Sequence, residues 1–261
     1  MDDKLLRRVV PTLVLLVAIA TWEAVVRINQ IPHYILPAPS LVASTLVADF
    51  GSLWPSWWFS IKLTFYALGL AVAGGVLLAV LSATNKWVEM SVMPFAIVLQ
   101  VTPIVAIAPL ILIFVPSTTG ALLICAFIVA FFPILSNTII GLKSADSNLK
   151  DLFFLYRANQ WQTLRHLLIP SATPYFIAGL KIAGGLSLIG AVVAEFTAGA
   201  AGRETGLASR ILEASYRTEI PRMFAALVLV SLTGVLIFML FNVVSKLVLG
   251  KWHESEVKAE R

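Results

Sequence analysis

The sequence has 261 residues, of which 59% are hydrophobic and only 13% are charged, and its mean hydropathy is +0.91. Soluble domains carry about 25% charged residues, so 19 basic and 14 acidic side chains are too few to cover a water-soluble surface of this size. A disordered chain is excluded because such chains are poor in apolar residues. The single cysteine, Cys125, excludes an internal disulfide framework. The composition therefore predicts an integral membrane protein.

The net charge of +5 does not indicate nucleic-acid binding. The basic residues form no continuous stripe, and the sequence has no groove-reading motif. In a membrane protein an excess of Lys and Arg reflects orientation in the bilayer. We therefore expect a lipid bilayer and no nucleic acid as the surroundings of this chain.

Long windows without charge locate the membrane spans, because a helix needs about 20 apolar residues to cross the hydrocarbon core. The windows 63–85 and 223–245 are each long enough for one helix. The window 90–142 is long enough for two helices, and Pro and Gly at 115–120 predict the turn between them.

Two further predicted spans carry charged residues. One covers about 9–26 with Glu23, and the other covers about 174–199 with Lys181 and Glu195. With the uncharged windows they make about six transmembrane helices, so the fold class is an all-α polytopic membrane protein.

The first span also has features of a secretory signal peptide, which is the alternative interpretation. Lys4, Arg7 and Arg8 precede a short apolar run, and Ala18 to Ala20 resembles a cleavage site. The apolar pattern continues to Val26, and five spans follow, so we favour an uncleaved first helix.

The distribution of Lys and Arg predicts that both termini are cytoplasmic. This orientation places twelve basic residues inside: Lys4, Arg7, Arg8, Lys86, Lys143, Lys150, Arg157, Arg165, Lys246, Lys251, Lys258 and Arg261. It places six outside: Arg27, Lys62, Arg203, Arg210, Arg217 and Arg222. We expect one transmembrane domain over 1–261, with a cytoplasmic loop at about 143–173 and an outer charged segment at about 201–222.

The cytoplasmic loop begins with a predicted amphipathic helix. Leu149, Leu152, Phe153 and Tyr156 fall at i, i+3, i+4 and i+7, which is one helical stripe. Such a helix either lies on the lipid headgroups or beneath the bundle, or inserts an aromatic side chain into a groove of a soluble partner. Spacing alone leaves both interpretations open.

Local capping signals divide this loop into two helices. Asp146 or Ser147 is suited to cap the first. Asn159 with Gln162 three residues later forms a capping-box pattern for a second, which we expect to end at about Ile169, before Pro170.

The segment 151–170, DLFFLYRANQWQTLRHLLIP, resembles the cytoplasmic loop of permease subunits of binding-protein-dependent ABC importers. That loop reads Glu-Ala-Ala, three residues, Gly, nine residues, Ile, one residue, Leu-Pro. Aligned on the terminal proline, 151–153 occupy the Glu-Ala-Ala positions, Arg157 the glycine, Leu167 the isoleucine and 169–170 the Leu-Pro.

Further segments extend the resemblance over about 60–250, within the nitrate/sulfonate/taurine branch of the family. They are QVTPIVAIAPLILIF (100–114), FFPILSNTIIG (131–141) and SATPYFIAGLKIAGGLSLIGAVVAEF (171–196). The departure at Arg157 matters, because glycine adopts a positive φ that arginine adopts only with strain. Either the bend is reshaped around Arg157, or the docking geometry is specialised for a dedicated ATPase.

The resemblance implies the permease subunit of a type I ABC importer in a bacterial inner membrane, with cargo such as an oxyanion, a sulfonate or a pyrimidine precursor. It implies a homodimer, two cytoplasmic ABC ATPases and a periplasmic or lipid-anchored solute-binding protein. The ATPases would bind ATP and Mg²⁺, since this chain has no phosphate-binding loop, and we expect no enzyme activity, cofactor or metal site in it. The expected ATPase-coupling residues are Leu149, Asp151, Leu152, Phe153, Tyr156 and Arg157.

Polar residues within the spans are candidates for the translocation path, because polar groups in the bilayer are costly. They are Gln100, Thr102, Asn137, Ser187 and Glu195. The alternative is structural: buried hydroxyls bond their own helix, amides link helices, and Glu195 lies at an interface or in an ion pair. Similarly, Pro103, Pro109 and Pro133 either open a cavity or shape the bundle.

Two rival classes of function are an ion-coupled secondary transporter and a non-transporting membrane scaffold. In the first, Glu195 and Lys181 would form the coupling pair. They are 14 residues apart, about 21 Å along one helix, so they do not pair within it. The outer segment 201–222 either meets a solute-binding protein or is a solvated face.

Overall fold

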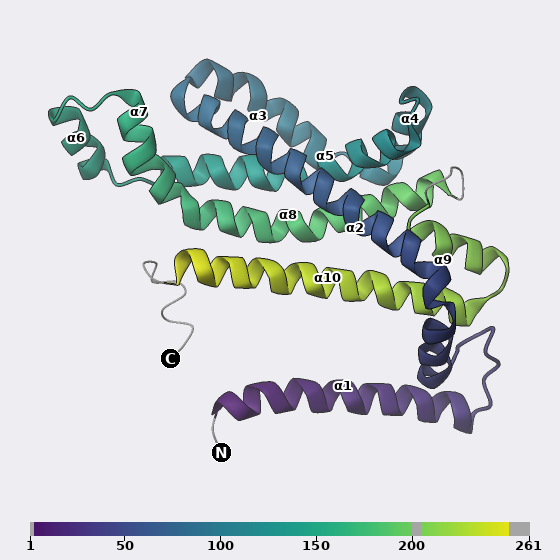
Figure 1. Ribbon diagram of the computed structural model, residues 1–261. Helices are drawn as coiled ribbons and strands as arrows, with labels where there is room; N and C mark the ends of the chain where they lie inside the picture. Colours follow the sequence, from purple (N-terminus) through teal and green to yellow (C-terminus); the bar gives the residue numbers. More distant parts are fainter. Residues whose placement is uncertain (1–2, 200–204, 251–261) are drawn as a thin grey trace.

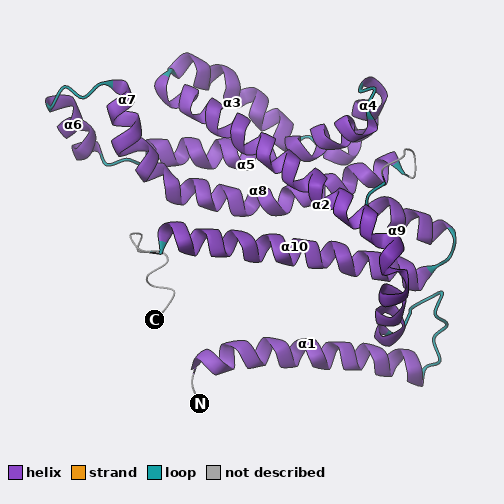
Figure 2. Ribbon diagram, viewed as in Figure 1, coloured by secondary structure: helices purple, strands orange, loops and turns teal. Residues whose placement is uncertain are grey.

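A computed structural model of the chain describes residues 3–199 and 205–250, and the regular structure in these ranges is entirely helical (Figures 1 and 2). The all-α prediction is therefore confirmed. The elements are α1 (Asp3–Ile28), α2 (Pro39–Thr84), α3 (Lys86–Val101), α4 (Ile104–Phe114), α5 (Thr118–Lys143), α6 (Ser147–Leu155), α7 (Gln160–Thr163), the π-helical turn η1 (Leu164–Leu168), α8 (Ile169–Ala198), α9 (Leu207–Tyr216) and α10 (Ile220–Leu249). Arg203, Lys251, Lys258 and Arg261, used above to predict topology, lie outside the described residues.

Within residues 3–199 and 205–250, five helical segments are long and apolar enough to cross a membrane, and a sixth arises if α3 and α4 form one broken span. These two helices meet at a bend of 104° at Thr102 and Pro103. Pro109 and Pro133 lie inside continuous helices instead. Of Pro103, Pro109 and Pro133, only Pro103 therefore breaks a span. The expected turn before α5 is confirmed: Ser117 caps the helix start, and its hydroxyl accepts the Gly120 N–H.

Helix α2 is much longer than the span predicted from its uncharged window. It runs for 46 residues, about 69 Å, which is more than twice the hydrocarbon thickness. The uncharged window 63–85 covers only the second half of this helix, because Lys62 and Pro55 also lie within it. Its first residue is Pro39, whose fixed φ suits a helix start.

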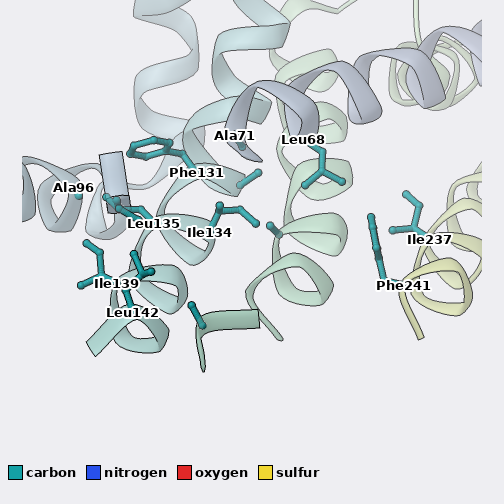
Figure 3. Close-up of a cluster of buried hydrophobic side chains, with 14 of the residues drawn as sticks. Leu68, Ala71, Ala96, Phe131, Ile134, Leu135, Ile139, Leu142, Ile237 and Phe241 are labelled. Atoms are coloured by element: carbon teal, nitrogen blue, oxygen red, sulfur yellow. The ribbon is translucent and has the colours of Figure 1, made fainter. Parts of the chain in front are cut away.

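The core forms where α5 packs between α2 and α8. Figure 3 shows Phe131, Ile134 and Leu135 of α5 beside Leu68 and Ala71 of α2. Small residues on α8 allow this close packing. A Cβ on Gly179 would lie 2.8 Å from the Pro133 carbonyl oxygen, and one on Gly190 would lie 2.9 Å from Ala126 Cα.

Helix α1 lies along one side of the bundle, and the segment after it leads into α2 (Figure 1). Glu23 of α1 accepts hydrogen bonds from the backbone N–H of Ser40 at 3.0 Å and its hydroxyl at 2.8 Å. Arg27 holds the same carboxylate at 2.5 Å. Glu23 therefore ties the end of α1 to the first turn of α2.

The loop after α5 contains both predicted helix starts. Asp146 caps α6, and Asn159 and Gln162 form the predicted capping box of α7. The predicted end before Pro170 was wrong, because the helix continues through η1 into α8. The wider turn of η1, in which Ile169 N–H bonds Leu164 O, accommodates a proline that has no N–H of its own.

Candidate functional site

The first candidate site is helix α6, which projects from one end of the bundle with α7 (Figure 1). No residue of α6 is buried. Phe154 is 83% exposed, Leu155 76% and Tyr156 81%. The predicted stripe omitted Phe154 and Leu155, because a 3.6-residue period assigns them to the opposite side. The apolar surface of α6 therefore extends around the helix.

The turn that ends α6 shows how the chain replaces the glycine of the resembling loop. Arg157 itself adopts φ +54°, in the left-handed region. Arg157 N–H bonds Phe154 O and Ala158 N–H bonds Phe153 O, each at 2.9 Å, which is the Schellman pattern of a helix C-terminus. The bend is thus kept with an arginine in a glycine-type conformation, and it is not reshaped.

A hollow of about 380 Å³ lies beside this turn. Leu152, Phe153 and Tyr156 line it from the α6 side, and Gln162 and His166 line it from α7 and η1. Three of the predicted coupling residues therefore share one apolar hollow. Leu149 and Asp151 lie on α6 outside its lining.

The second candidate site is a cavity of about 350 Å³ at the break between α3 and α4. Gln100 and Thr102 both line it, opposite Val129 of α5 and Leu186 of α8. The Thr102 hydroxyl donates to Val98 O at 2.7 Å within its own helix. The structure thus brings together two of the five polar residues predicted for a path.

The other three candidates lie elsewhere. Asn137 donates to Pro133 O at 2.8 Å and packs where α8 has Gly179. Ser187 is buried and donates to Gly184 O at 3.0 Å. Ser187 therefore has the structural role given as the alternative for buried hydroxyls, whereas the Asn137 amide donates to its own helix.

Glu195 is fully buried near the end of α8, so it does not face water as an interfacial carboxylate would. One carboxylate oxygen accepts the Ser60 hydroxyl of α2 at 2.7 Å. The other accepts Ala208 N–H of α9 at 2.9 Å. Because N–H groups at a helix start lack partners within the helix, Glu195 acts as a cap for α9 supplied by another helix. Sequence spacing carried no signal of this contact.

The described part of the outer charged segment, residues 205–222, comprises α9, the turn after it and the start of α10. Glu213 accepts a hydrogen bond from Arg210 at 2.8 Å and forms an ion pair with Arg217, also at 2.8 Å. The hydrogen bond from Arg210 is the main cause that lowers the pKa of Glu213 below its ordinary value. Arg222 contacts Glu219 at 3.3 Å and Asp49 at 3.6 Å. This end of the molecule is therefore a network of paired charges.

Two chains of solved ABC transporter structures share this helical fold. The structure is similar to a chain of the MetNI methionine ABC transporter in an inward-facing conformation, with a TM-score of 0.59 and 18% identity, over 75% of this chain and 94% of that chain. It is also similar to a chain of an amino acid ABC transporter, with a TM-score of 0.57 and 17% identity. These likenesses show the fold.

The chain is also similar in sequence to several transport permease proteins. The riboflavin transport system permease protein RibX of Chloroflexus aurantiacus is 29% identical over 92% of this chain and 89% of its own length. The formylaminopyrimidine transport permease protein ThiX of Halalkalibacterium halodurans is 31% identical over 87% and 90%. The aliphatic sulfonates permease SsuC of Bacillus subtilis, named as putative, is 23% identical over 92% and 86%.

Residues 71–250 match the family model described as "Binding-protein-dependent transport system inner membrane component". The chain belongs to this family. It is a non-catalytic membrane permease subunit of an ABC importer, and the resemblance stated from residues 60–250 is confirmed.

Proposed function

We propose that two copies of this chain form the translocation path of an ATP-driven importer, with an ABC ATPase docked on α6 of each copy. The observation that carries the proposal is the exposed apolar surface of α6. Phe154, Leu155 and Tyr156 are more than three-quarters exposed at one end of the bundle. An amphipathic helix of this kind supplies the apolar side chains that fill a partner's groove.

The continuous helix from α7 to α8 supports a mechanical link to that docking site. Residues Gln160–Ala198 form one helical run of 39 residues. Its far end bears Glu195, which holds α9. A displacement of α6 and α7 by an ATPase would therefore reach the opposite end of the bundle through one element, by rigid-body motion.

The orientation that we propose has α6 in the cytoplasm and α9 on the periplasmic side, where a solute-binding protein would deliver the cargo. Lys86, Lys143 and Lys150 support it, because they lie at the α6 end and cytoplasmic segments are rich in basic residues. Lys143 also pairs with Glu89 there, joining α5 to α3. Both termini are cytoplasmic in this orientation.

For the cargo we propose a small solute of the pyrimidine-precursor or oxyanion and sulfonate classes. Relatives matching over most of this chain are named for riboflavin, formylaminopyrimidine and aliphatic sulfonates. Gln100 and Thr102, at the cavity of the α3–α4 break, remain our candidates for contact with it.

The proposal is tested by reconstituting the permease with its ATPase and binding protein in liposomes and measuring solute uptake. Uptake is expected to require hydrolysable ATP and the binding protein. Uptake driven by an ion gradient alone would contradict the proposal, and so would purification of the chain without an ATPase. The rival pairing of Glu195 with Lys181 is not favoured, because Glu195 binds Ser60 and Ala208.

A variant at the proposed docking surface sharpens this test. Tyr156→Asp places a charge on the apolar surface of α6 and should reduce ATP-dependent uptake and ATPase association by more than about tenfold, as expected for an interface anchor. Trp87→Asp is the matched control, because Trp87 is 79% exposed at the start of α3 and is not part of α6. Equal losses in both variants would contradict docking on α6.

A further inference from the structure

A hollow of about 280 Å³ lies between α2 and the start of α9, at the end of the bundle opposite α6. Ser56, Trp58, Phe59 and Lys62 line it from α2, and Arg210 lines it from α9. It is separate from the cavity that holds Gln100 and Thr102. Two cationic side chains therefore face one hollow with two aromatic neighbours.

The charges in this hollow are not balanced by its own lining. Within the described ranges, Lys62 makes no ion pair or hydrogen bond. Arg210 donates a hydrogen bond from Nε to the Ser56 hydroxyl at 3.0 Å and another from one terminal nitrogen to the Glu213 carboxylate at 2.8 Å. Glu213 is itself shared with Arg217, so a single carboxylate serves two guanidinium groups. The described lining of the hollow therefore contains two positive charges and no acidic side chain.

The lining positions these cations and limits their access to water. Ser56 is 2% exposed and Phe59 7% exposed, so the α2 wall is firmly packed. The hydrogen bond to Ser56 orients the Arg210 guanidinium. Trp58 is about half exposed at the rim. Charges beside apolar walls interact more strongly than charges in open water, because the local dielectric constant is lower.

We propose that Lys62 and Arg210 together bind one anionic group, a carboxylate, sulfonate or phosphate, in this hollow. Two like charges facing one space repel each other unless an anion lies between them, and Arg210 retains a terminal nitrogen with no partner among the described residues. The same chemistry belongs to an organic anion in water and to an anionic lipid headgroup, since α2 and α9 meet at an end of the bundle.

The test measures the acylation rate of Lys62 by an uncharged amine-reactive ester, using the full chain in phosphatidylcholine nanodiscs and peptide mass spectrometry. Lys86, at the other end of the bundle, is the internal reference. One arm adds benzenesulfonate, with neutral benzenesulfonamide as the shape control. The other arm replaces one lipid in three with phosphatidylglycerol.

We expect Lys62 to react at least about threefold more slowly relative to Lys86 in one or both arms, because a bound anion stabilises the unreactive ammonium form. Slowing by benzenesulfonate assigns the site to a soluble anion, and slowing by phosphatidylglycerol alone assigns it to a headgroup. Arg210→Gln should abolish the effect, whereas Arg165→Gln, with the same charge change on η1 at the opposite end of the bundle, should retain it.

Three results would overturn the proposal. One is an unchanged Lys62 rate in both arms, which needs no variant to interpret. Another is equal slowing by benzenesulfonamide, which would show that charge is not recognised. The third is equal slowing of Lys62 acylation in folded Arg210→Gln protein, which would show that Arg210 does not contribute to anion binding.

Discussion

Ser60 of α2 donates its hydroxyl to the Glu195 carboxylate of α8 at 2.7 Å, and the same hydroxyl oxygen accepts Leu207 N–H at 2.9 Å. Helix α9 begins after Gly206, which has no side chain with which to cap it. Its first N–H groups are therefore capped by residues from two other helices. This arrangement ties α9 to α2 and α8, the elements that also pack on the core helix α5.

Replacing Ser60 tests the energy of this cap. Ser60→Ala leaves the Leu207 N–H and one Glu195 oxygen without their partner in a buried site. Such losses cost about 1–3 kcal/mol, so the thermal unfolding midpoint of the purified permease should fall clearly. Ser44→Ala is the control, because Ser44 is solvent-exposed and bonds only within its own turn. Equal midpoints for Ser60→Ala and wild type would show that the cap contributes little.

Replacing Gly206 tests whether the absence of a side chain beside the Glu195 carboxylate is essential. A Cβ at Gly206 would lie 2.1 Å from the Glu195 carboxylate, although its φ of −83° suits any residue. Gly206→Ala should therefore destabilise by about 2 kcal/mol or more through overpacking alone. Gly51→Ala, with nothing within 4 Å of the added methyl group, should be neutral or stabilising by about 0.5–1 kcal/mol. Chemical denaturation of both variants gives the comparison, and similar values would refute the overpacking argument.

Arg157 tests the strain in the turn after α6. Arg157→Gly should relieve about 1 kcal/mol, because glycine has no Cβ to clash at φ +54°. Arg157→Ala removes the same charge but keeps the Cβ, so it should not relieve this strain. Hydrogen exchange at the Ala158 amide, which bonds Phe153 O, should slow about fivefold in the glycine variant only. Slowing in both variants would trace the effect to charge instead.

The lowered pKa of Glu213 predicts that the stability of the α9 end decreases at acid pH. The pKa of Glu213 in the folded protein is lowered below the ordinary 4.5, chiefly by the Arg210 hydrogen bond. Burial, the next largest effect, raises it, and the nearby Arg210, Arg217 and Arg222 charges lower it further. A lowered folded-state pKa gives stability that is fully present above pH 4.5 and is lost as the pH falls through the folded value.

The measurement is the unfolding midpoint as a function of pH between about 3 and 6. Glu213→Gln should flatten the decline below pH 4.5 and lower stability above it. Asp151→Asn is the control, because Asp151 lies on α6 and makes no ion pair with the described residues. An identical pH profile for wild type and Glu213→Gln would contradict the role of this carboxylate.

Features that depend on local chemistry could be predicted from the sequence. Uncharged windows located the spans, because hydrocarbon offers a charge no partner. Asp146 and the Asn159–Gln162 pair marked two helix starts, since a cap involves residues only two or three positions apart. The loop motif also indicated the family, which the match to 71–250 confirmed.

Features that depend on distant residues were decided only by the tertiary structure. Three prolines share the same local signal, yet only Pro103 lies at a break. Arg157 adopts a glycine conformation because the helix-ending hydrogen bonds hold it there.

Glu195 shows the same division most clearly. By itself it was an isolated charge in a predicted span, and its separation from Lys181 excluded only one partner. Ser60 lies 135 residues away in the sequence, so no local pattern connects the two. Its burial and its bonds to Ser60 and Ala208 arise because α2, α8 and α9 converge at one point. The sequence alone determined that a carboxylate lies in this span, whereas the packing of three helices determined that it caps α9.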